Sequence, residues 1–393
     1  MPVINSIARL ADEMTAWRRD LHAHPEIAFE EVRTADIVAE KLASWGITVH
    51  RGLAQTGVVG VLEGARPGPR AIALRADMDA LPMAEKNTFA HRSTIAGKMH
   101  GCGHDGHTTM LLGAARHLAE TRNFAGTVYF IFQPAEENEG GARVMVAEGL
   151  FDRFPVDAVY GLHNNPGLAV GQAAMRPGPA MAAFDIFEIT ITGTGAHGAM
   201  PHLGNDPVVI AAQVVTALQT IVSRATDPIQ SAVVSVTQIH AGDAWNVIPE
   251  DVVMRGTARS FTPAVRDGIE RRIGEIAEGV AAAFGARAEV RYERRYPPVV
   301  NTAAETERAA AAVAEVLGAD NVRQDAAPKM ASEDFAYMLE ARPGCYIWLG
   351  NGGAGEDGGC AVHNPHYDFN DAILPIGASY WVRLVETLLP KEG

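Results

Sequence analysis

Cysteine, histidine and carboxylate side chains gather in a few short segments of this 393-residue chain. In the segment GKMHGCGHDGH, Cys102 and His104 stand two residues apart, and Gly101 and Gly103 let side chains crowd around one point. A thiolate and an imidazole at close spacing suit zinc or a similar metal ion. This loop therefore predicts a metal site, and a loop cysteine without function is the simpler alternative.

Two adjacent carboxylates, Glu136 and Glu137, follow an apolar run in the segment QPAEEN. In extended backbone, neighbouring side chains point in opposite directions. One carboxylate, Glu137, can then bind a metal ion, while Glu136 faces the attacking water and acts as a general base. An ordinary acidic turn would have the same sequence, so the pair needs support from other residues.

Two further histidines complete a donor set for two metal ions. His163 follows another apolar run in GLHN, and His363 lies in AVHNPHYDF, before the last expected helix. These two histidines bring the number of candidate ligands to five. If the two metals share one ligand, each metal has three protein ligands. Two metals a few ångströms apart can share a hydroxide nucleophile and polarise a carbonyl group. The sequence therefore predicts a dinuclear hydrolase centre, with Cys102, His104, Glu137, His163 and His363 as its ligands.

The apolar runs that precede these residues predict an α/β fold with a mixed central sheet flanked by helices. Expected strands are Val58–Leu62, Ala71–Leu74, Val128–Phe132 and Val156–Tyr160, and helical segments such as Thr108–Glu120 separate them. The last three strands each end in polar residues. Because ligands of open α/β sheets bind beyond the carboxyl ends of strands, we expect these polar tails to share one site.

Helical patterns are expected at both ends of the chain. Apolar residues spaced three and four apart predict a helix over Ile7–Leu21, and a second helix should cover Thr34–Trp45. Near the carboxyl end, we expect a helix at Thr302–Leu317, a strand at Cys345–Leu349 and a closing helix at Asp371–Leu389.

Between residues 184 and 295 the pattern changes to strand, helix, strand, strand, helix and strand. This is the order of the ferredoxin-like α+β motif. Segments rich in Gly and Pro flank it and could act as hinges. We therefore expect a catalytic domain made of residues 1–183 and 296–393, with an inserted ferredoxin-like lid domain at 184–295.

Charge and composition exclude several classes of partner. Acidic residues outnumber basic ones by 47 to 33, and no segment is rich in Lys and Arg, so we expect no nucleic-acid or membrane partner. The longest nearly apolar run, Pro207–Leu218, is shorter than the roughly 20 residues that span a bilayer. The first residues lack the pattern of a signal peptide, and three cysteines cannot make a disulfide framework. These features predict a cytoplasmic protein.

Eight segments together resemble the M20 metallopeptidase family: RADMDALP, GCGHDGH, QPAEENEGGA, GLHN, GAHGAMPH, NVIP and ASEDF with HNPHYDF. The chain is most similar to the M20D subgroup, which contains hippurate hydrolases and N-acyl-L-amino acid amidohydrolases of the aminoacylase type. The resemblance covers nearly the whole chain in the right order. It also implies an inserted lid that serves as a dimerisation domain.

The resemblance assigns roles to individual residues. It implies that the five candidate ligands hold the metals and that Glu136 is the catalytic base. It also implies that Cys102 takes the bridging position that an aspartate fills in the peptidase branch, which favours an amidohydrolase. Asp79 matches an aspartate that orients a ligand histidine. Asp77, Asp105 and His107 could also lie around the ligands, and His22, His24, His202 and His366 are expected to be structural.

Three residues of the lid resemble groups that contact the substrate. His197 is similar to a histidine that reaches the active site of a partner subunit and stabilises the oxyanion. Asn246 and Arg255 resemble substrate-contacting residues, and Arg255 could bind a substrate carboxylate through two charge-assisted hydrogen bonds. A histidine that acts in a partner's site requires a homodimer, or a dimer of dimers, formed through the lid.

The resulting prediction is metal-dependent hydrolysis of N-acyl amino acids, hippurate-like or N-acetyl-amino-acid-like, to a carboxylic acid and a free amino acid. The expected cofactors are two divalent metal ions, with zinc favoured and manganese, nickel or cobalt compatible. A dinuclear di- or aminopeptidase is the first alternative. A hydrolase that uses Cys102 as its nucleophile and His104 as its base is the second. A binding protein without activity is the third.

Overall fold

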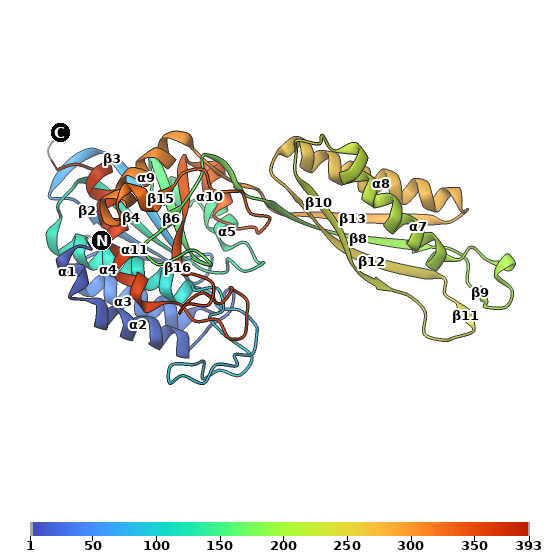
Figure 1. Cartoon of the computed structure of the whole chain (residues 1–393), viewed down its shortest axis with the longest axis horizontal. Helices are drawn as coiled ribbons and strands as arrows, with labels where there is room; N and C mark the ends of the chain where they lie inside the picture. The colour runs from blue at the N-terminus through green and yellow to red at the C-terminus, as the bar shows by residue number, and fades with distance from the viewer. Residues whose placement is uncertain (1–2, 392–393) are drawn as a thin grey trace. The chain divides into compact units, whose positions relative to one another are not determined.

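The computed structural model describes residues 3–391, and these separate into two compact units, each with its own hydrophobic core (Figure 1). The chain leaves the first unit twice, first for a long segment and later for a short one, and returns to it each time. Of the described residues, the first unit contains 3–180, 300–327 and 334–391, and the second contains 181–299 and 328–333. The domain boundaries expected from the sequence stay a proposal.

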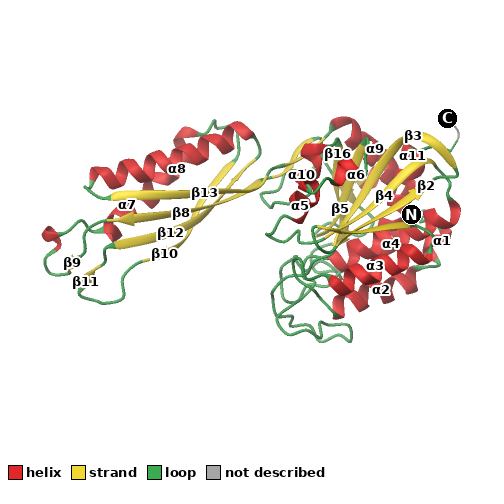
Figure 2. Ribbon diagram, turned by 180° about the vertical axis from the view of Figure 1, so that it is seen from behind, coloured by secondary structure: helices red, strands yellow, loops and turns green. Residues whose placement is uncertain are grey.

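A mixed sheet forms the centre of the first unit (Figure 2). It has eight strands, in the order β1-β2-β4-β3-β5-β16-β6-β15. Strand β3 runs parallel to β4 and β5, and β16 runs parallel to β5, whereas β1, β2 and β4 are joined by antiparallel pairing. The strands are β1 Thr48–Leu53, β2 Gly57–Glu63, β3 Arg66–Asp77, β4 Ala125–Gln133, β5 Ala158–Pro166, β6 Ala173–Ala174, β15 Val322–Arg323 and β16 Gly344–Gly352.

Helices pack on this sheet and on one another. Helix α4 contacts β3 and lies beside α2 and α11, and α11 in turn packs on α9. Met110, Leu111 and Leu112 of α4 are fully buried, so this helix runs through the core of the unit. The helices are α1 Asn5–Ala8, α2 Ala11–Ala23, α3 Val32–Ser44, α4 His104–Thr121, α5 Gly141–Ala147, α6 Leu150–Arg153, α9 Ala303–Leu317, α10 Ala336–Ala341 and α11 Leu374–Leu388.

The second unit contains a four-stranded antiparallel sheet in the order β10-β12-β8-β13, covered by α7 and α8. This is the ferredoxin-like arrangement. Burial alternates along β8, where Phe187, Ile189 and Ile191 face the core. The main elements are β8 Ala183–Thr192, α7 Pro207–Thr220, β10 Ala232–His240, β12 Asp251–Ser260, α8 Pro263–Ala283 and β13 Arg287–Tyr296. The small strands β9 Ala196–His197 and β11 Val247–Ile248 pair with each other in this unit. Strands β7 Gly178–Met181 and β14 Val299–Asn301 also pair with each other, and most of their residues belong to the first unit.

The fold class is confirmed, but several elements differ from the sequence-based prediction. The helix expected over Ile7–Leu21 is divided between α1 and α2. Strand β1 was not expected, because it is a partly exposed edge strand without an apolar run. Strand β5 continues past Tyr160 to Pro166, because it pairs with β16 over that length, so His163 lies within a strand.

One helical segment of the described chain, Pro207–Ala225, is long and apolar enough to cross a membrane by length and composition alone. It consists of α7 and the π-helix η2 (Ile221–Ala225), so it is longer than the run identified in the sequence. Core helices pass the same test. Ile210, Val214 and Leu218 are buried in the core of the second unit, which makes one face of this helix part of that core.

Candidate metal centre

The five predicted ligands lie together in two groups of three that have Cys102 in common. Donor atoms of Cys102, His104 and His163 all lie within 4.8 Å of one another. The same holds for Cys102, Glu137 and His363. One shared sulfur between two sets of three donors is the count that the sequence predicted for two metal ions.

The five ligands come from four parts of the first unit, and two of them flank the start of α4. Cys102 lies in the loop before α4, and His104 is the first residue of that helix. Gly103 between them has a φ of 97°, and a Cβ atom there would lie 2.4 Å from Asn164 Oδ1. Only glycine fits this position, so the backbone can turn sharply between the two donors. Glu137 follows β4, and His363 follows β16 in a loop where its own φ is 62°.

Hydrogen bonds donated by the Nδ1 atoms orient two of the histidines. His104 Nδ1 donates to Asp79 O at 2.8 Å, and His163 Nδ1 donates to Asn164 O at 2.6 Å. Both Nε2 atoms are therefore available as donors toward a metal. His163 Nε2 lies 3.3 Å from Cys102 Sγ, whereas His104 Nε2 is buried without a hydrogen-bond partner among residues 3–391. An orphaned buried nitrogen is the feature expected of a metal ligand.

The charges around these donors favour cations. Burial raises the pKa of the Cys102 thiol, and the Glu137 carboxylate raises it further. Hydrogen bonds to Cys102 and Glu137 raise the pKa of His363 to about 10. Burial opposes a proton on His104, but Asp77 and Cys102 outweigh it and raise the pKa of that imidazole. Burial and the neighbouring His107, by contrast, lower the pKa of His163, so that imidazole is neutral and ready to bind a metal. Divalent cations would displace the protons of the other three donors on binding, so these residues fit a metal pair.

Glu136 lies beside the donors without belonging to either group. Glu136 is only 7% exposed, and its carboxylate lies within 4.8 Å of donor atoms of His104 and Glu137. The backbone N–H of Asp334 donates to Glu136 Oε1 at 3.3 Å. Asp79 accepts hydrogen bonds from the N–H groups of Glu136 and Glu137, at 3.0 and 2.9 Å. Asp79 therefore contacts both His104 and the loop that carries the two glutamates.

A fully buried arginine supports this loop, and the sequence did not reveal it. Arg75 donates to Asp77 Oδ2 at 2.7 Å, to Asp334 Oδ1 at 3.1 Å and to Gln133 Oε1 at 2.7 Å. Asp77 also lies 2.6 Å from His107 Nδ1. The motifs RADMDALP and QPAEEN contain Arg75, Asp77 and Gln133. The sequence signal that could have revealed Arg75 was its charge directly after an apolar run.

A second polar cluster lies next to the Cys102 loop. His22 Nδ1 is 2.8 Å from Asp105 Oδ2, and His22 Nε2 is 3.2 Å from Glu85 Oε1. Arg18 Nη1 is 3.7 Å from the same Asp105 oxygen. Burial opposes a proton on His22, but the hydrogen bonds to Asp105 and Glu85 outweigh it and raise the pKa of His22 to about 9. His22 is therefore a buried cation that ties α2 to the first turn of α4.

The three predicted substrate-contacting residues all lie in the second unit. His197 in β9 pairs with Val247 in β11, and Gly198 N donates to Asn246 O at 2.7 Å, so His197 and Asn246 are neighbours. Arg255 lies on β12, where its Nε donates to Glu188 Oε2 at 2.7 Å. Arg255 also lines a hollow of about 510 Å³ on the sheet face opposite α7 and α8.

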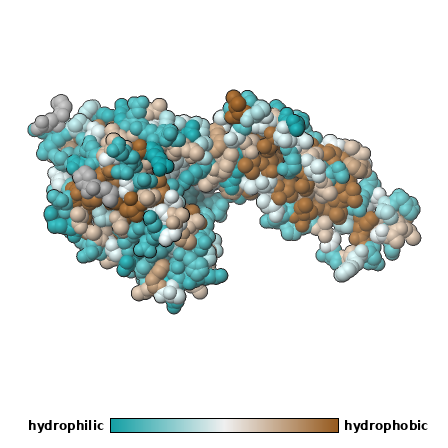
Figure 3. Space-filling view, in the orientation of Figure 1, coloured by the Kyte–Doolittle hydropathy of each residue, from teal (hydrophilic) through white to brown (hydrophobic). Residues whose placement is uncertain are grey.

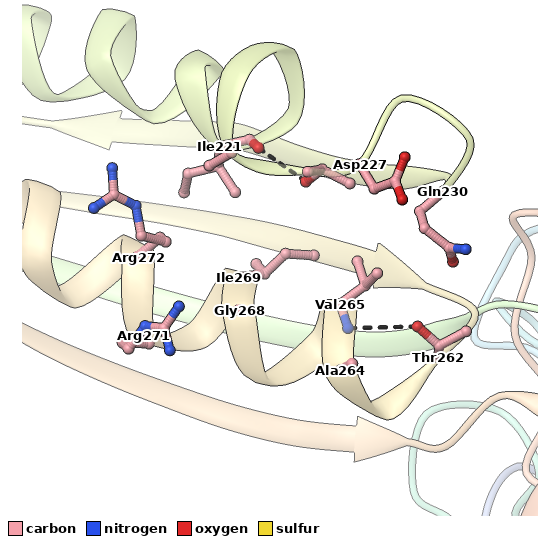
Figure 4. A pocket seen from close by; sticks show the side chains of 12 residues that line it. Ile221, Asp227, Gln230, Thr262, Ala264, Val265, Gly268, Ile269, Arg271 and Arg272 are labelled. Atoms are coloured by element: carbon pink, nitrogen blue, oxygen red, sulfur yellow. Dashed lines mark hydrogen bonds between the residues drawn. The ribbon is translucent and has the colours of Figure 1, made fainter.

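Another hollow of the second unit, of about 560 Å³, lies between the end of η2 and the start of α8 (Figure 4). Thr262 caps α8 there, because its Oγ1 accepts a hydrogen bond from Val265 N. Asp227 is the acidic residue among the side chains that line it. None of the predicted site residues borders this hollow, so it is separate from the chemistry described above.

Comparison with known proteins adds evidence from sequence. A profile described as peptidase family M20/M25/M40 matches residues 73–387. An N-acetyl-L-cysteine deacetylase of Bacillus subtilis (strain 168) is 41% identical over 382 residues, covering 96% of this chain and 88% of that protein. A hippurate hydrolase of Campylobacter jejuni is 38% identical over 384 residues, covering 98% of both.

A solved structure is similar over the same length. A dinuclear metal-binding peptidase of the M20 family from Bacillus subtilis has a TM-score of 0.83 and 34% sequence identity to this chain. The match covers 97% of this chain and 99% of the other. These similarities extend across both compact units, so they concern the whole chain rather than one part of it.

Proposed function

The chain belongs to peptidase family M20/M25/M40 and is an amide-bond hydrolase of that family, and we propose that its substrates are N-acyl amino acids. The products are a carboxylic acid and a free amino acid. The observation that carries this proposal is the pair of three-residue donor groups that share Cys102. Glu136, a carboxylate outside both groups, lies close enough to serve them as a base.

We assign one metal ion to Cys102, His104 and His163, and a second to Cys102, Glu137 and His363. Two divalent ions held there supply Lewis-acid activation of the scissile carbonyl and of water. A thiolate with imidazoles favours zinc, and manganese, nickel and cobalt suit the same donors. The relative described as dinuclear metal-binding supports a count of two.

Glu136 is the proton carrier in this proposal. Its carboxylate is buried, and the hydrogen bond from Asp334 N to Oε1 fixes its orientation. Glu136 takes a proton from the water that attacks the acyl carbon, and it delivers that proton to the leaving nitrogen. Asp79 holds the backbone of Glu136 and Glu137 in place, so the base and a ligand keep a constant relative position.

We assign substrate contacts to the second unit, with residues 184–295 as a lid domain. His197 and Asn246, which are neighbours, donate to the oxyanion that forms on the acyl oxygen. Arg255 binds the carboxylate of the amino acid, and it would exchange its partner Glu188 for the substrate. These assignments rest on the family resemblance of the three residues and on their exposure.

We propose a homodimer formed through the lid, and two exposed features of the second unit support it. Val208, Val209 and Val222 on the helical segment of α7 and η2 are 39–50% exposed, and Figure 3 shows apolar side chains gathered over this unit. Strand β10 is an edge of the four-stranded sheet, so it can pair with β10 of a second copy. A dimer of this kind would let His197 serve the partner's site.

We also propose that the protein works in a reducing compartment such as the cytoplasm. Cys102, Cys345 and Cys360 are all free thiols. Cys102 must stay reduced to bind metal, and disulfides form readily only in oxidising compartments.

The experiment that tests the function measures metal content and hydrolysis together. Purified protein is analysed for metals and assayed on hippurate, N-acetyl amino acids, an indole-3-acetyl amino acid and a free dipeptide, before and after chelation and metal re-addition. About two metal equivalents and chelator-reversible hydrolysis of the N-acyl compounds are expected. Preference for the dipeptide would favour the peptidase alternative. Activity that survives metal removal but not thiol alkylation would assign the chemistry to Cys102 and refute the proposal.

A further inference from the structure

The loop that carries Glu136 and Glu137 has a backbone that needs outside support. Ala135 has a φ of 56° and Asn138 a φ of 67°, both in the left-handed region that side chains other than glycine disfavour. Gly141 N donates to Ala135 O at 2.8 Å and closes the loop. Strained residues of this kind persist only where surrounding contacts hold them.

Three successive N–H groups of this loop donate to two buried carboxylates. Asp79 accepts from Glu136 and Glu137, as described above. The other acceptor is Glu31, whose Oε1 accepts from Ala135 N at 2.8 Å. Glu31 lies 104 positions before Ala135 in the chain, and its residue is 0% exposed. The bond from Ala135 therefore ties the strained residue directly before Glu136 to the start of α3.

The side chain of Glu31 does not serve its own helix. Glu31 is the N-cap residue of α3 but makes no side-chain capping hydrogen bond. Glu26 caps the helix instead, because its carboxylate accepts hydrogen bonds from Arg33 N at 3.0 Å and Thr34 N at 2.8 Å. The second oxygen of Glu31 accepts from the Thr56 hydroxyl at 2.7 Å. The carboxylate of Glu31 thus points away from α3 and toward the glutamate loop.

A carboxylate in this position is unfavourable by itself. Burial, and after it the nearby charge of Asp79, raise the pKa of Glu31 to about 7 against the hydrogen bonds that lower it. An apolar residue would fill the same space without this penalty. Stability alone therefore does not explain a glutamate here, whereas an acceptor for Ala135 N does.

We propose that Glu31 is a positioning residue that holds Ala135 in its left-handed conformation and so aims the Glu136 carboxylate. This inference rests on the proposed function, in which Glu136 carries the proton. Without an acceptor for its N–H, Ala135 relaxes to an ordinary φ, and the next residue swings with it. Glu137 follows less, because its side chain is also held by His363. A displacement of about 1 Å at a catalytic group lowers turnover by about 100-fold.

The test compares Glu31→Gln with Glu31→Met in the full-length, metal-loaded protein. Both substitutions remove the charge and keep the length, but only glutamine offers an oxygen to Ala135 N. Glu26→Ala is the matched control, because it removes two backbone hydrogen bonds from the same segment without touching the glutamate loop. The readouts are kcat and KM, metal content, melting temperature, and hydrogen exchange of the amides at residues 135–138.

Glu31→Met should lower kcat by about 10- to 100-fold with KM within about twofold and two metals retained. Amide exchange at 135–138 should accelerate at least about tenfold in that variant, because the Ala135 N–H has lost its acceptor. Glu31→Gln should stay within about threefold of wild type in both. Glu26→Ala should lower the melting temperature and leave kcat and loop exchange unchanged.

Three results would overturn the inference: wild-type loop exchange in Glu31→Met, equal loss of kcat in the glutamine and methionine variants, or a matching loss of kcat in Glu26→Ala. If Glu31→Met does not fold, the loop exchange rates of Glu31→Gln and Glu26→Ala still test the inference. Faster loop exchange in Glu31→Gln would show that an amide oxygen at position 31 does not hold the loop, and would refute the inference. Wild-type protein that hydrolyses no N-acyl amino acid would refute the proposed function instead, and the exchange data would still report whether Glu31 holds the loop.

Discussion

Replacing Arg75 with methionine should destabilise the first unit more than any surface charge substitution. The Arg75 guanidinium has no exposed area and donates to the carboxylates of Asp77 and Asp334 and to the Gln133 amide. Methionine fills similar space but donates nothing. Both carboxylates, which are themselves buried, then lose the positive charge and the hydrogen bonds of Arg75.

The expected magnitude follows from this geometry. Removing one partner of a buried ion pair lowers the free energy of unfolding by about 3–5 kcal/mol, because a charge is left in a poorly solvated site. For a unit of this size, each kcal/mol shifts the melting temperature by about 2–4 °C, so the loss is about 6–20 °C. Turnover should fall as well, because Asp334 N orients Glu136.

Urea denaturation followed by tryptophan fluorescence measures the effect in the right unit. Trp17, Trp45, Trp348 and Trp381 belong to the first unit, whereas the remaining tryptophan, Trp245, is fully exposed and changes little on unfolding. The matched control is Arg116→Met, which removes ion pairs to Glu13 and Glu120 at the surface.

The control should change the free energy of unfolding by less than about 1 kcal/mol, because water screens such pairs. If Arg75→Met is no more destabilising than Arg116→Met, the buried network does not carry the stability assigned to it. The reasoning from unpaired buried charge would then be wrong.

Three further predictions concern the base, the shared sulfur and a buried histidine. Glu136→Gln should lower kcat by about 100- to 10,000-fold and keep both metals, as measured by turnover and elemental analysis; near wild-type turnover would contradict its role. Cys102→Ala should retain less metal than His163→Ala, which should keep about one equivalent, because only the sulfur belongs to both groups. The raised pKa of His22 stabilises the fold fully below pH 6.5, and this contribution is lost as pH rises to about 9. Urea titrations at pH 6 and 9 should therefore show wild type losing up to about 3 kcal/mol more than His22→Gln over that interval.

Donor chemistry and periodicity were readable from the sequence because both are local. The spacing of Cys102 and His104 on a glycine-rich loop and the alternation along β8 each depend on a few adjacent residues. The family resemblance is confirmed by the profile match, and the α/β class with a ferredoxin-like insertion is confirmed by the sheet topology.

Contacts between distant segments were not readable. Glu31 meets Ala135, and Arg75 meets Asp334, through hydrogen bonds that span 104 and 259 positions of the chain. Their sequence signal is only a charged residue beside an apolar run, which a surface residue would share. Strand β1 escaped notice for the opposite reason, because an exposed edge strand needs no apolar run. Pairing with β16 extended β5 beyond the point where its own sequence turns polar.

The place of β16 in the sheet has a consequence for synthesis of the chain on the ribosome. All nine residues of β16 are buried, and the strand lies between β5 and β6, which are made about 170 residues earlier. At roughly 5–20 residues per second, the edge of β5 waits roughly 10–35 seconds for its neighbour while the entire second unit is translated. During that time the nascent sheet presents an apolar, unpaired edge. Yield of the folded enzyme should therefore depend on chaperone supply more than the stability of the finished protein suggests.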